Sequence, residues 1–331
     1  MEKGMVSVTI PVYNRQEYIR ECIESVFAQS YQNFEIIIVD DGSTDNTLQI
    51  CRELQEQDSR IKLLQGAHKG VSAARNQTLE AVSGEYVFFL DSDDAIHPKL
   101  LETFVNALEQ TGAAIAGTVV QSIPHTSWHQ LPEFVEKQGN SAETVYHDHA
   151  DTLHAVFHGT TPLGNIGGVM IRSCLIGQTR FRTDLYIGED FFYIYENLIK
   201  GADAVFLKQR WYYARIHKHN TSNSFTFDGF WTRFLRRKLV WESEDRLGRP
   251  ENAKVHKRDA VSVFHRCLLK DIMDKAEKKK MLQVMKQHKK QLLKAQSLKG
   301  KVLFLASLYV PALYVRYARI RKEKKGNNSI W

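Results

Sequence analysis

The first hundred residues alternate short, β-branched apolar runs with stretches in which apolar residues recur every three or four positions. The runs at 6–10, 34–39, 61–64 and 86–90 predict strands, and the stretches at 17–29, from 43 or 44 onward, and at 71–81 predict helices. Pro11 is expected to end the first strand, because proline cannot donate to the ladder of a central strand. This regular succession indicates an α/β fold with a mostly parallel, doubly wound sheet.

Acidic residues follow two of these predicted strands. Asp40 and Asp41 come after the second strand, and Asp91, Asp93 and Asp94 come after the fourth. Ligands of open α/β sheets bind beyond the carboxyl ends of the strands, so these carboxylates are predicted to lie at a binding site. Like charges so close together are unfavourable unless a proton or a cation neutralises them, and a divalent ion bridging to a diphosphate would do so. The alternative is a polar turn in which Asp94 only caps the next helix.

The rest of the chain has an irregular middle and a helical end. Segment 121–163 contains three prolines and many polar residues and is predicted to form loops over the site. Segment 164–171 is predicted to be a strand that other backbone approaches closely. From about 227 onward the periodicity is helical. We therefore expect one domain over 1–225, with a regular half at about 1–110 and a less regular half at about 111–225, followed by a basic helical region over 226–331.

Cysteine and histidine spacing favours neither a disulfide framework nor a zinc site. The four cysteines share no ligand or disulfide spacing and are expected to be reduced thiols of a cytoplasmic protein. Four clustered histidines have no cysteine or convincing third ligand near them, so a solvated helix face is the better interpretation. The residues concerned are Cys22, Cys51, Cys174 and Cys267, and His147, His149, His154 and His158.

Charge is unevenly distributed along the chain. From residue 270 to the end there are 17 Lys/Arg and 4 Asp/Glu, a balance of +13, so residues 1–269 carry −6 of the chain's total of +7. This pattern excludes a general nucleic-acid binder and suggests a body that handles cations and a tail that meets an anionic partner. Segment 302–315 is uncharged and contains Pro311, and it is too short to cross a bilayer.

Two interpretations of this tail stay open. Segment 302–315 could lie in a membrane interface with its basic flanks on anionic headgroups. Alternatively, it could form a helix pair packed on the core or on another subunit, as in a homo-oligomer. Because the sequence has no secretory signal and no spanning segment, the expected location is cytoplasmic, with peripheral binding to the inner face of the cell membrane as one option.

Four segments of the chain occur in a recognisable order and spacing. They are VTIPVYN at 8–14, FEIIIVDDGSTD at 34–45, GVSAARN at 70–76 and GEYVFFLDSDD at 84–94. These segments resemble the ordered motifs of family 2 glycosyltransferases with the GT-A fold. The resemblance covers residues 5 to about 225. It implies a Rossmann-like nucleotide-binding half joined to an acceptor half, and inverting transfer, usually from a UDP-sugar, with Mn²⁺ or Mg²⁺.

The resemblance implies a nucleotide-sugar pocket formed by the first two motifs. Pro11, Tyr13 and Asn14 would line this pocket, and Asp40 would hydrogen-bond the uracil with the assistance of Asp41. The next two motifs would complete it. Arg75 would contact the base or a phosphate, Asp91 would face the ribose, Asp93 would hold the metal, and Asp94 would support the metal site or touch the sugar. The family often has Asn-x-Gly where this chain has His68-Lys-Gly70, so the contact made by that loop is left open.

Two later segments are similar to the family's acceptor-side and closing motifs. In Gly188-Glu-Asp190, the resemblance implies that Asp190 is the catalytic base and that Glu189 orients the acceptor or supports the loop. An alternative role for Asp190 is to cap a helix that starts at Phe191. In the segment 211–217, Arg215 would neutralise the diphosphate, and His217 would complete the metal shell or touch phosphate.

The sequence therefore predicts a metal-dependent, inverting glycosyltransferase that uses a nucleotide-diphosphate sugar to build a surface polysaccharide, teichoic acid or related glycan, with a glycan or lipid-linked acceptor. One alternative is a sugar nucleotidyltransferase, but Asn14-Arg-Gln-Glu17 is not the Gly-rich phosphate loop that such an enzyme needs. The other alternative is an inactive scaffold that binds a nucleotide sugar.

Overall fold

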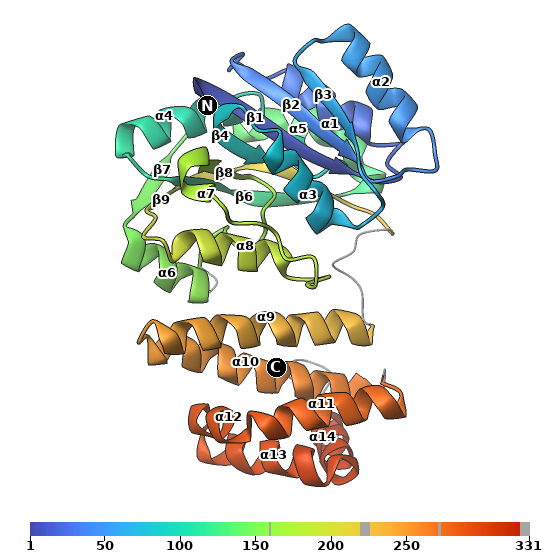
Figure 1. The fold of residues 1–331 in the computed structure, drawn as a ribbon, viewed down its shortest axis with the longest axis vertical. Helices are drawn as coiled ribbons and strands as arrows, with labels where there is room; N and C mark the ends of the chain where they lie inside the picture. The colour runs from blue at the N-terminus through green and yellow to red at the C-terminus, as the bar shows by residue number, and fades with distance from the viewer. Residues whose placement is uncertain (159, 219–225, 271–272, 325–331) are drawn as a thin grey trace. The chain divides into compact units, whose positions relative to one another are not determined.

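The computed structural model describes residues 1–158, 160–218, 226–270 and 273–324, and the chain forms two compact units (Figure 1). Unit 1 comprises Met1–Thr183 and Glu189–Asn220, and unit 2 comprises Asp184–Gly188 and Thr221–Trp331. The predicted domain limit at 225 falls in the stretch 219–225, which lies outside the described residues.

A nine-stranded mixed sheet, counted over the described residues, forms the centre of unit 1 (Figure 1). Its path is β3-β2-β1-β4-β8-β6-β9-β5, and β7 pairs with β9. The strands are β1 Glu2–Val12, β2 Phe34–Asp40, β3 Ile61–Gln65, β4 Gly84–Phe89, β5 Ala95–Ile96, β6 Ile115–Pro124, β7 Thr144–His147, β8 Val169–Arg172 and β9 Ala204–Ile216.

The first four strands are mutually parallel, so the predicted α/β half is confirmed. Parallel pairing aligns the carboxyl ends of β1, β2 and β4 at one edge of the sheet, where the predicted site residues follow. The expectation that Pro11 ends β1 was wrong, because β1 continues to Val12 and Pro11 pairs with Val39 of β2. The pairing of β1 with β4 stops at Thr9, so Pro11 lies where the ladder continues on one side of the strand only.

The helices of the first half pack on this sheet and share its core. They are α1 Ile19–Phe27, α2 Thr47–Gln57 and α3 Val71–Glu80, as the periodicity predicted, and α4 Leu100–Thr111, which was not predicted. Ile19, Cys22, Ile23 and Val26 of α1 are fully buried in the core that β1, β2 and β4 also form. The cap expected at Ser43 or Thr44 was wrong, because α2 begins at Thr47 and its N-cap position is Asn46, whose side chain makes no capping bond. The Thr47 amide donates instead to Asp45 Oδ1, at 3.0 Å.

Segment 121–163 is not the set of loops that its composition predicted. It contains the end of β6, a 3₁₀ helix (η1, His125–Gln130), α5 Leu131–Gln138, β7 and α6 His149–His158. Pro132 occupies the first turn of α5, where its missing N–H costs nothing, so this proline starts a helix instead of ending one. The four clustered histidines lie on β7 and α6, and the described residues contain no group of three or more His, Cys, Asp or Glu that could hold a metal.

The strand expected at 164–171 is shorter and shifted, because β8 starts only at Val169. Gly167 and Gly168 precede it, and the ring of Tyr212 on β9 approaches them, rather than other backbone. A Cβ on Gly167 would lie 2.7 Å from the Tyr212 hydroxyl oxygen. Two short helices, α7 Ser173–Ile176 and α8 Glu189–Leu198, complete unit 1.

Unit 2 is helical, as predicted, and has a core of its own. Its helices are α9 Phe227–Arg246, α10 Pro250–Lys270, α11 Lys275–Gln287, α12 Lys289–Ala295, α13 Leu298–Tyr309 and α14 Pro311–Lys324. Phe234, Trp241, Phe264, Met281 and Phe304 are fully buried in this core. Within the described part of the chain, no helix combines the length and the apolar character needed to cross a membrane.

Candidate active site

The site forms where β1, β2 and β4 end, at the edge that the sequence predicted. Asn14, just beyond β1, is held by the loop that follows β2. Its backbone N–H donates to Ser43 Oγ (2.9 Å), and its side-chain oxygen accepts from the Thr44 N–H (2.8 Å). Asn14 has a φ of +50°, which asparagine tolerates better than most residues. The structure therefore gives Asn14 a clear role in joining two loops of the pocket.

The two carboxylates after β2 have different surroundings. Asp41 holds the loop before α3, because its two side-chain oxygens accept hydrogen bonds from the amides of Lys69 (3.0 Å) and Gly70 (2.7 Å). Asp40 accepts from the Ser43 amide through Oδ2 (3.0 Å). Its other oxygen, Oδ1, is buried and has no hydrogen-bond partner among the described residues. Asp40 thus keeps an acceptor that an N–H of a ligand could satisfy.

An aromatic pair lies beside these carboxylates. The rings of Tyr13 and His68 are 4.6 Å apart, and His68 Nδ1 is 3.0 Å from the carbonyl oxygen of Asp41. Tyr13 is 39% exposed, so its ring is accessible to a ligand. His68 stands where the family often has asparagine, and the structure shows that it packs on Tyr13. Pro11 is buried in β1, two residues before this ring.

Arg75 of α3 joins three carboxylates that are distant in sequence. Its Nη1 lies 2.6 Å from Asp190 and 3.2 Å from Glu189, and its Nη2 lies 2.9 Å from Asp91. The guanidinium is buried and packs on the ring of Phe181, 5.3 Å from the centroid. Arg75 therefore links the acidic turn after β4 to the start of α8.

Within this cluster, the pKa of Glu189 is strongly shifted by its surroundings. Burial and the adjacent charge of Asp190, opposed by Arg75, raise the pKa of Glu189 to about 8. Glu189 is therefore protonated at neutral pH, and the pair shares one negative charge next to Arg75. Both residues lie in the first turn of α8, which begins at Glu189. The alternative role of Asp190 as the cap of a helix starting at Phe191 was thus wrong by two residues.

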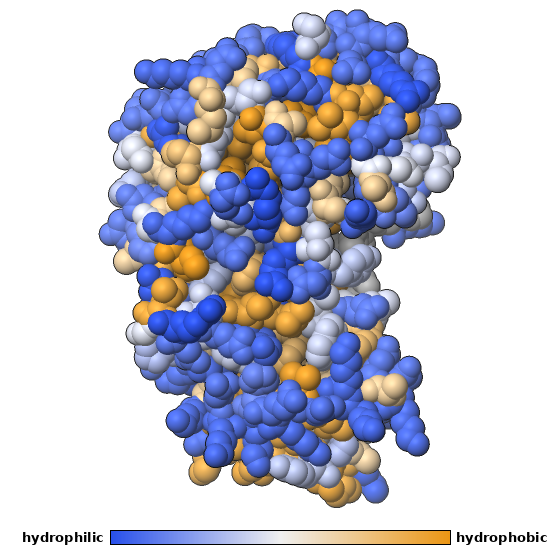
Figure 2. Space-filling view, in the orientation of Figure 1, coloured by the Kyte–Doolittle hydropathy of each residue, from blue (hydrophilic) through white to orange (hydrophobic). Residues whose placement is uncertain are grey.

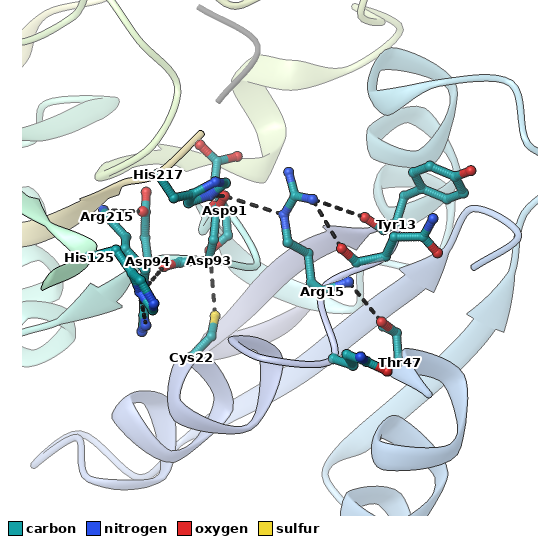
Figure 3. Close-up of polar contacts among 12 residues, drawn as sticks. Tyr13, Arg15, Cys22, Thr47, Asp91, Asp93, Asp94, His125, Arg215 and His217 are labelled. Carbon is teal, nitrogen blue, oxygen red and sulfur yellow. Dashed lines mark hydrogen bonds and ion pairs between the residues drawn. The ribbon is translucent and has the colours of Figure 1, made fainter. Parts of the chain in front are cut away.

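Asp93 contacts both His217 and Arg15, as Figure 3 shows. His217 Nε2 lies 2.7 Å from Asp93 Oδ2, and Arg15 Nε lies 3.3 Å from the same oxygen. Burial alone would raise the pKa of Asp93, but the bond with His217 and the charge of Arg15 outweigh it and lower that pKa. Asp93 is therefore an ionised carboxylate beside an imidazole, 124 residues away in sequence.

Asp93 and His217 suit a divalent cation that takes its other ligands from a diphosphate and water. Carboxylate oxygen and imidazole nitrogen are both ligands that Mn²⁺ accepts, and the two side chains already lie within contact of each other. Two protein ligands are consistent with the lack of any larger cluster in the described residues. The residues present thus fit the predicted metal.

Arg215 holds the acidic turn in place. Its amide donates to Asp94 Oδ1 (2.8 Å), and its Nε donates to the backbone oxygen of Asp93 (3.0 Å). Its guanidinium carbon lies 3.8 Å from the ring centroid of Trp128 and 4.7 Å from that of Tyr18. Burial and the charges of Asp93 and Asp91 raise the pKa of Asp94 well above its usual range. The predicted role of Arg215 in neutralising a diphosphate stays a prediction.

Several residues around this site were not singled out from the sequence. Arg15 contacts Asp93, Glu21 forms an ion pair with Arg215, and the Tyr212 hydroxyl accepts from the Asp91 amide (3.2 Å). Trp128 lies in the segment that was expected to form loops. Arg15 directly follows the first motif and Tyr212 lies inside the segment 211–217, so adjacency to motifs was the available signal. Nothing in the sequence points to Glu21 or Trp128.

Comparisons with known proteins relate the chain to glycosyltransferases. Residues 7–160 match the family described as Glycosyl transferase family 2. The chain is 31% identical over 225 residues to the glycosyltransferase GlyA of Streptococcus pneumoniae, a match that covers 67% of this chain and 32% of GlyA. It is 40% identical over 112 residues to GlyG of the same organism, covering 34% of this chain and 37% of GlyG. The chain spans about a third of the length of the curated relatives it matches.

Two solved structures share the fold. Staphylococcus aureus TarS 1–349 in complex with UDP-GlcNAc superposes with a TM-score of 0.65 at 19% identity, covering 95% of this chain and 87% of TarS 1–349. The mannosyltransferase PcManGT of Pyrobaculum calidifontis, in complex with GDP-Man and Mn²⁺, gives 0.53 at 16% identity, covering 96% and 86%. Together with the family match, these neighbours show that the chain carries a family 2 glycosyltransferase domain with the GT-A fold, followed by a helical C-terminal region.

Proposed function

We propose that unit 1 transfers a sugar, with inversion, from a nucleotide-diphosphate donor to an acceptor hydroxyl. One observation carries this proposal: a single network of contacts contains both sets of carboxylates that such a transfer requires. Asp93 and Asp91 follow β4 on the donor side, while Glu189 and Asp190 start α8, and Arg75 connects Asp91 to both of the latter. Inverting transfer needs one acidic group near the leaving diphosphate and another that takes the acceptor proton.

For the donor we propose a UDP-sugar. Asp40 Oδ1 is a buried acceptor with no partner among the described residues, and the N–H of a uracil ring would supply one. The exposed ring of Tyr13, packed beside His68, provides a surface on which a base can stack. The complex of TarS with UDP-GlcNAc supports this choice, whereas PcManGT binds GDP-Man.

For the leaving group we propose that Asp93 and His217 hold Mn²⁺ or Mg²⁺. Bound there, the cation would neutralise charge on the diphosphate as the bond to the sugar breaks. Arg15 brings a further positive charge to the same place, since its Nε lies 3.3 Å from Asp93. Asp94 and Arg215 fix the backbone of the turn that presents Asp93.

For the acceptor side we propose that Asp190 is the base. Burial favours the protonated form of Glu189, which makes it the weaker candidate for a base at neutral pH. The ion pair with Arg75 positions the Asp190 carboxylate, with 2.6 Å between Nη1 and Asp190 Oδ1, so an incoming hydroxyl has to compete with Arg75 for it. We propose a hydroxyl of a cell-surface polysaccharide, teichoic acid or related glycan, which is supported by the bacterial origin of the relatives.

The test is a panel of UDP- and GDP-sugars, first screened with Mn²⁺ for a raised unfolding temperature and then incubated with acceptor glycans. A glycosyltransferase releases free nucleoside diphosphate and forms a product of inverted anomeric configuration, which NMR identifies. Release of pyrophosphate would instead support a sugar nucleotidyltransferase. Binding of a donor without any turnover would support an inactive scaffold.

Two variants separate catalysis from binding. Asp190→Asn is expected to lower turnover on the order of a hundredfold or more and to leave donor stabilisation intact. Glu133→Gln removes an exposed acid of α5 and is expected to change neither. Wild-type turnover in Asp190→Asn would exclude this residue as the base.

A further inference from the structure

Exposed apolar side chains are concentrated on the last two helices of unit 2. Thirteen large apolar residues are exposed in the described part of the chain, and six of them lie between Leu298 and Tyr317. The other seven are scattered over the preceding 297 residues. Scattered exposed apolar residues are normal, but a contiguous group is a mark of an interaction surface. The six are Leu298, Val302, Tyr309, Val310, Leu313 and Tyr317.

On α13 these side chains form one stripe. Leu298, Val302, the half-buried Leu305 and Tyr309 follow one another at spacings of four, three and four residues. In an α-helix this spacing keeps them within an arc of about 60°. Leu298 is 81% exposed and Val302 is 62% exposed, whereas Phe304 on the other side of the helix is fully buried in the unit 2 core. The outer side of α13 is therefore apolar in addition to its inner side.

Helix α14, which packs against α13, carries further exposed apolar side chains. Leu313 and Tyr317 are one helical turn apart, and they are 62% and 47% exposed. Val310, between the two helices, is also exposed. Figure 2 shows hydrophobic residues exposed between hydrophilic ones over the region of α13 and α14. We call these six exposed residues, together with Leu305, the apolar stripe.

Basic side chains border the apolar stripe. Lys299 and Lys301 are exposed and project on opposite sides of it, given the helical spacing from Leu298. Lys289 donates to the hydroxyl of Tyr309 (3.0 Å), and Lys286 lies 5.3 Å from the centroid of the same ring. From Lys286 to Lys322 the sequence contains ten Lys or Arg and no Asp or Glu. The segment that carries the apolar stripe is therefore strongly positive.

An apolar stripe bordered by lysines favours one kind of binding partner. A second copy of the same surface would bring like charges together, which disfavours self-association through it. A soluble polyanion would satisfy the lysines but would leave the leucine, valine and tyrosine side chains in water. We propose that α13 and α14 bind the surface of a bilayer containing anionic lipids, with the apolar stripe among the acyl chains and the lysines at the headgroups.

The proposal goes beyond sugar transfer and can be tested without any turnover. The full chain is mixed with phosphatidylcholine vesicles, with or without about a third phosphatidylglycerol, and the bound fraction is measured by sedimentation. Binding is expected only to the anionic vesicles, and it should weaken as salt is raised because exposed charges are then screened. No binding to either kind of vesicle would overturn the proposal. Equal binding to both would also overturn it, because the lysines would then have no part.

Matched variants test the two components of the surface. Leu298→Ser, Val302→Ser and Leu313→Ser, combined, remove exposed side chains without touching the core, and we expect vesicle affinity to fall on the order of tenfold or more. The double variant Lys299→Glu with Lys301→Glu is expected to lower vesicle affinity by a similar factor. Leu247→Ser changes an apolar residue that is 46% exposed elsewhere in unit 2 and should bind as the wild type does. Circular dichroism and the unfolding temperature check that each variant is folded.

Measuring how deeply the apolar stripe enters the bilayer distinguishes lipid binding from binding of a soluble polyanion or a second copy of the chain. In Val302→Trp the new indole is expected to shift its emission to shorter wavelength on anionic vesicles and to be quenched by brominated lipid tails. A soluble polyanion such as polyphosphate should give neither change. An emission unchanged on vesicles would show that the apolar stripe stays in water. Sedimentation equilibrium that shows an oligomer dissolved by the triple serine variant would assign this surface to a second copy and overturn the proposal.

Discussion

Asp93 has a positively charged neighbour, the side chain of Arg15. Arg15 Nε is 3.3 Å from Asp93 Oδ2, and the Arg15 side chain is also held by the backbone oxygens of Tyr13 (3.3 Å) and Asn14 (3.1 Å). This arrangement balances the charge of the Asp93 carboxylate. It also means that a divalent ion has to displace or repel a positive charge before it reaches Asp93.

We therefore expect Arg15→Gln to bind Mn²⁺ more tightly than the wild type when no nucleotide is present. Removing one positive charge about 4 Å from a divalent ion corresponds to about 2 kcal/mol even at the dielectric constant of water, or about a thirtyfold lower dissociation constant. Electron paramagnetic resonance of free Mn²⁺ measures it directly. Arg20→Gln, which removes an exposed arginine paired with Glu53, serves as the control. An affinity that is unchanged or weaker in a folded Arg15→Gln variant would contradict this expectation.

Glu189 makes a second prediction, about stability. Its pKa is about 8 in the folded protein, against an ordinary value of 4.5, so between these values the folded chain keeps a proton that the unfolded chain has lost. The free energy of unfolding should therefore fall as pH rises through this window, by about 1.4 kcal/mol for each unit of the pKa difference. Glu189→Gln cannot lose this proton, so its stability should depend less on pH. The free energy of unfolding of the two proteins is measured with urea at about pH 5 and about pH 8. An equal change with pH in the wild type and in Glu189→Gln would contradict the assigned pKa.

The sequence predicted most of the residues that meet at the site, but not how they are held. Family resemblance brought Asp93 and His217 into one hypothesis, and the structure places them 2.7 Å apart. Their roles as metal ligands stay predictions. The three-way ion pair of Arg75 was not foreseen, because it depends on α8 lying beside α3, and no local pattern encodes that contact.

At the scale of elements, regular periodicity correctly predicted the parallel half of the sheet. Composition wrongly predicted loops for segment 121–163. The strands at 34–39 and 86–90 are nearly all apolar because both faces of the sheet are covered, and this signal is strong. Segment 121–163 has a polar composition because η1, α5 and β7 are mostly exposed. Polar, proline-containing sequence therefore concealed three helices, including the first turn of α5 at Pro132.

The close contact between Tyr212 of β9 and Gly167, in the turn before β8, provides a prediction at this scale. A methyl group on Gly167 would lie 2.7 Å from the Tyr212 hydroxyl oxygen and 2.9 Å from its ring carbon Cζ, and this hydroxyl supports the Asp91 amide. Gly167→Ala should therefore destabilise the protein by about 1–3 kcal/mol through overpacking. Gly164→Ala places its methyl group in open space and is the matched control. Equal unfolding temperatures for the two variants would show that Tyr212 can move without cost.

At the scale of the molecule, the chain combines two units with separate cores and opposite charge. The family motifs all lie in unit 1, and the basic surface of α13 and α14 lies in unit 2. Charge balance along the sequence anticipated this division, because it depends only on residue counts. The domain limit at 225 stays a prediction. The apolar stripe could not be read from the sequence, since inner and outer sides of α13 are both apolar and only packing distinguishes Phe304 from Val302.

If nucleotide binds at the edge of the sheet in unit 1, its effect on the backbone should be confined there. We expect UDP with Mn²⁺ to slow hydrogen exchange in peptides that contain Tyr13 to Asp45, Asp91 to Asp94 and the end of β9, because ligand binding suppresses local opening. Peptides from α9 to α14 should exchange as they do without ligand. Asp40→Ala removes the unpartnered acceptor and should abolish the protection around β2 at the same concentration of UDP. Protection that appears mainly in the C-terminal helices would place the nucleotide elsewhere, and the proposed assignment of Asp40, Asp93 and His217 would then fail.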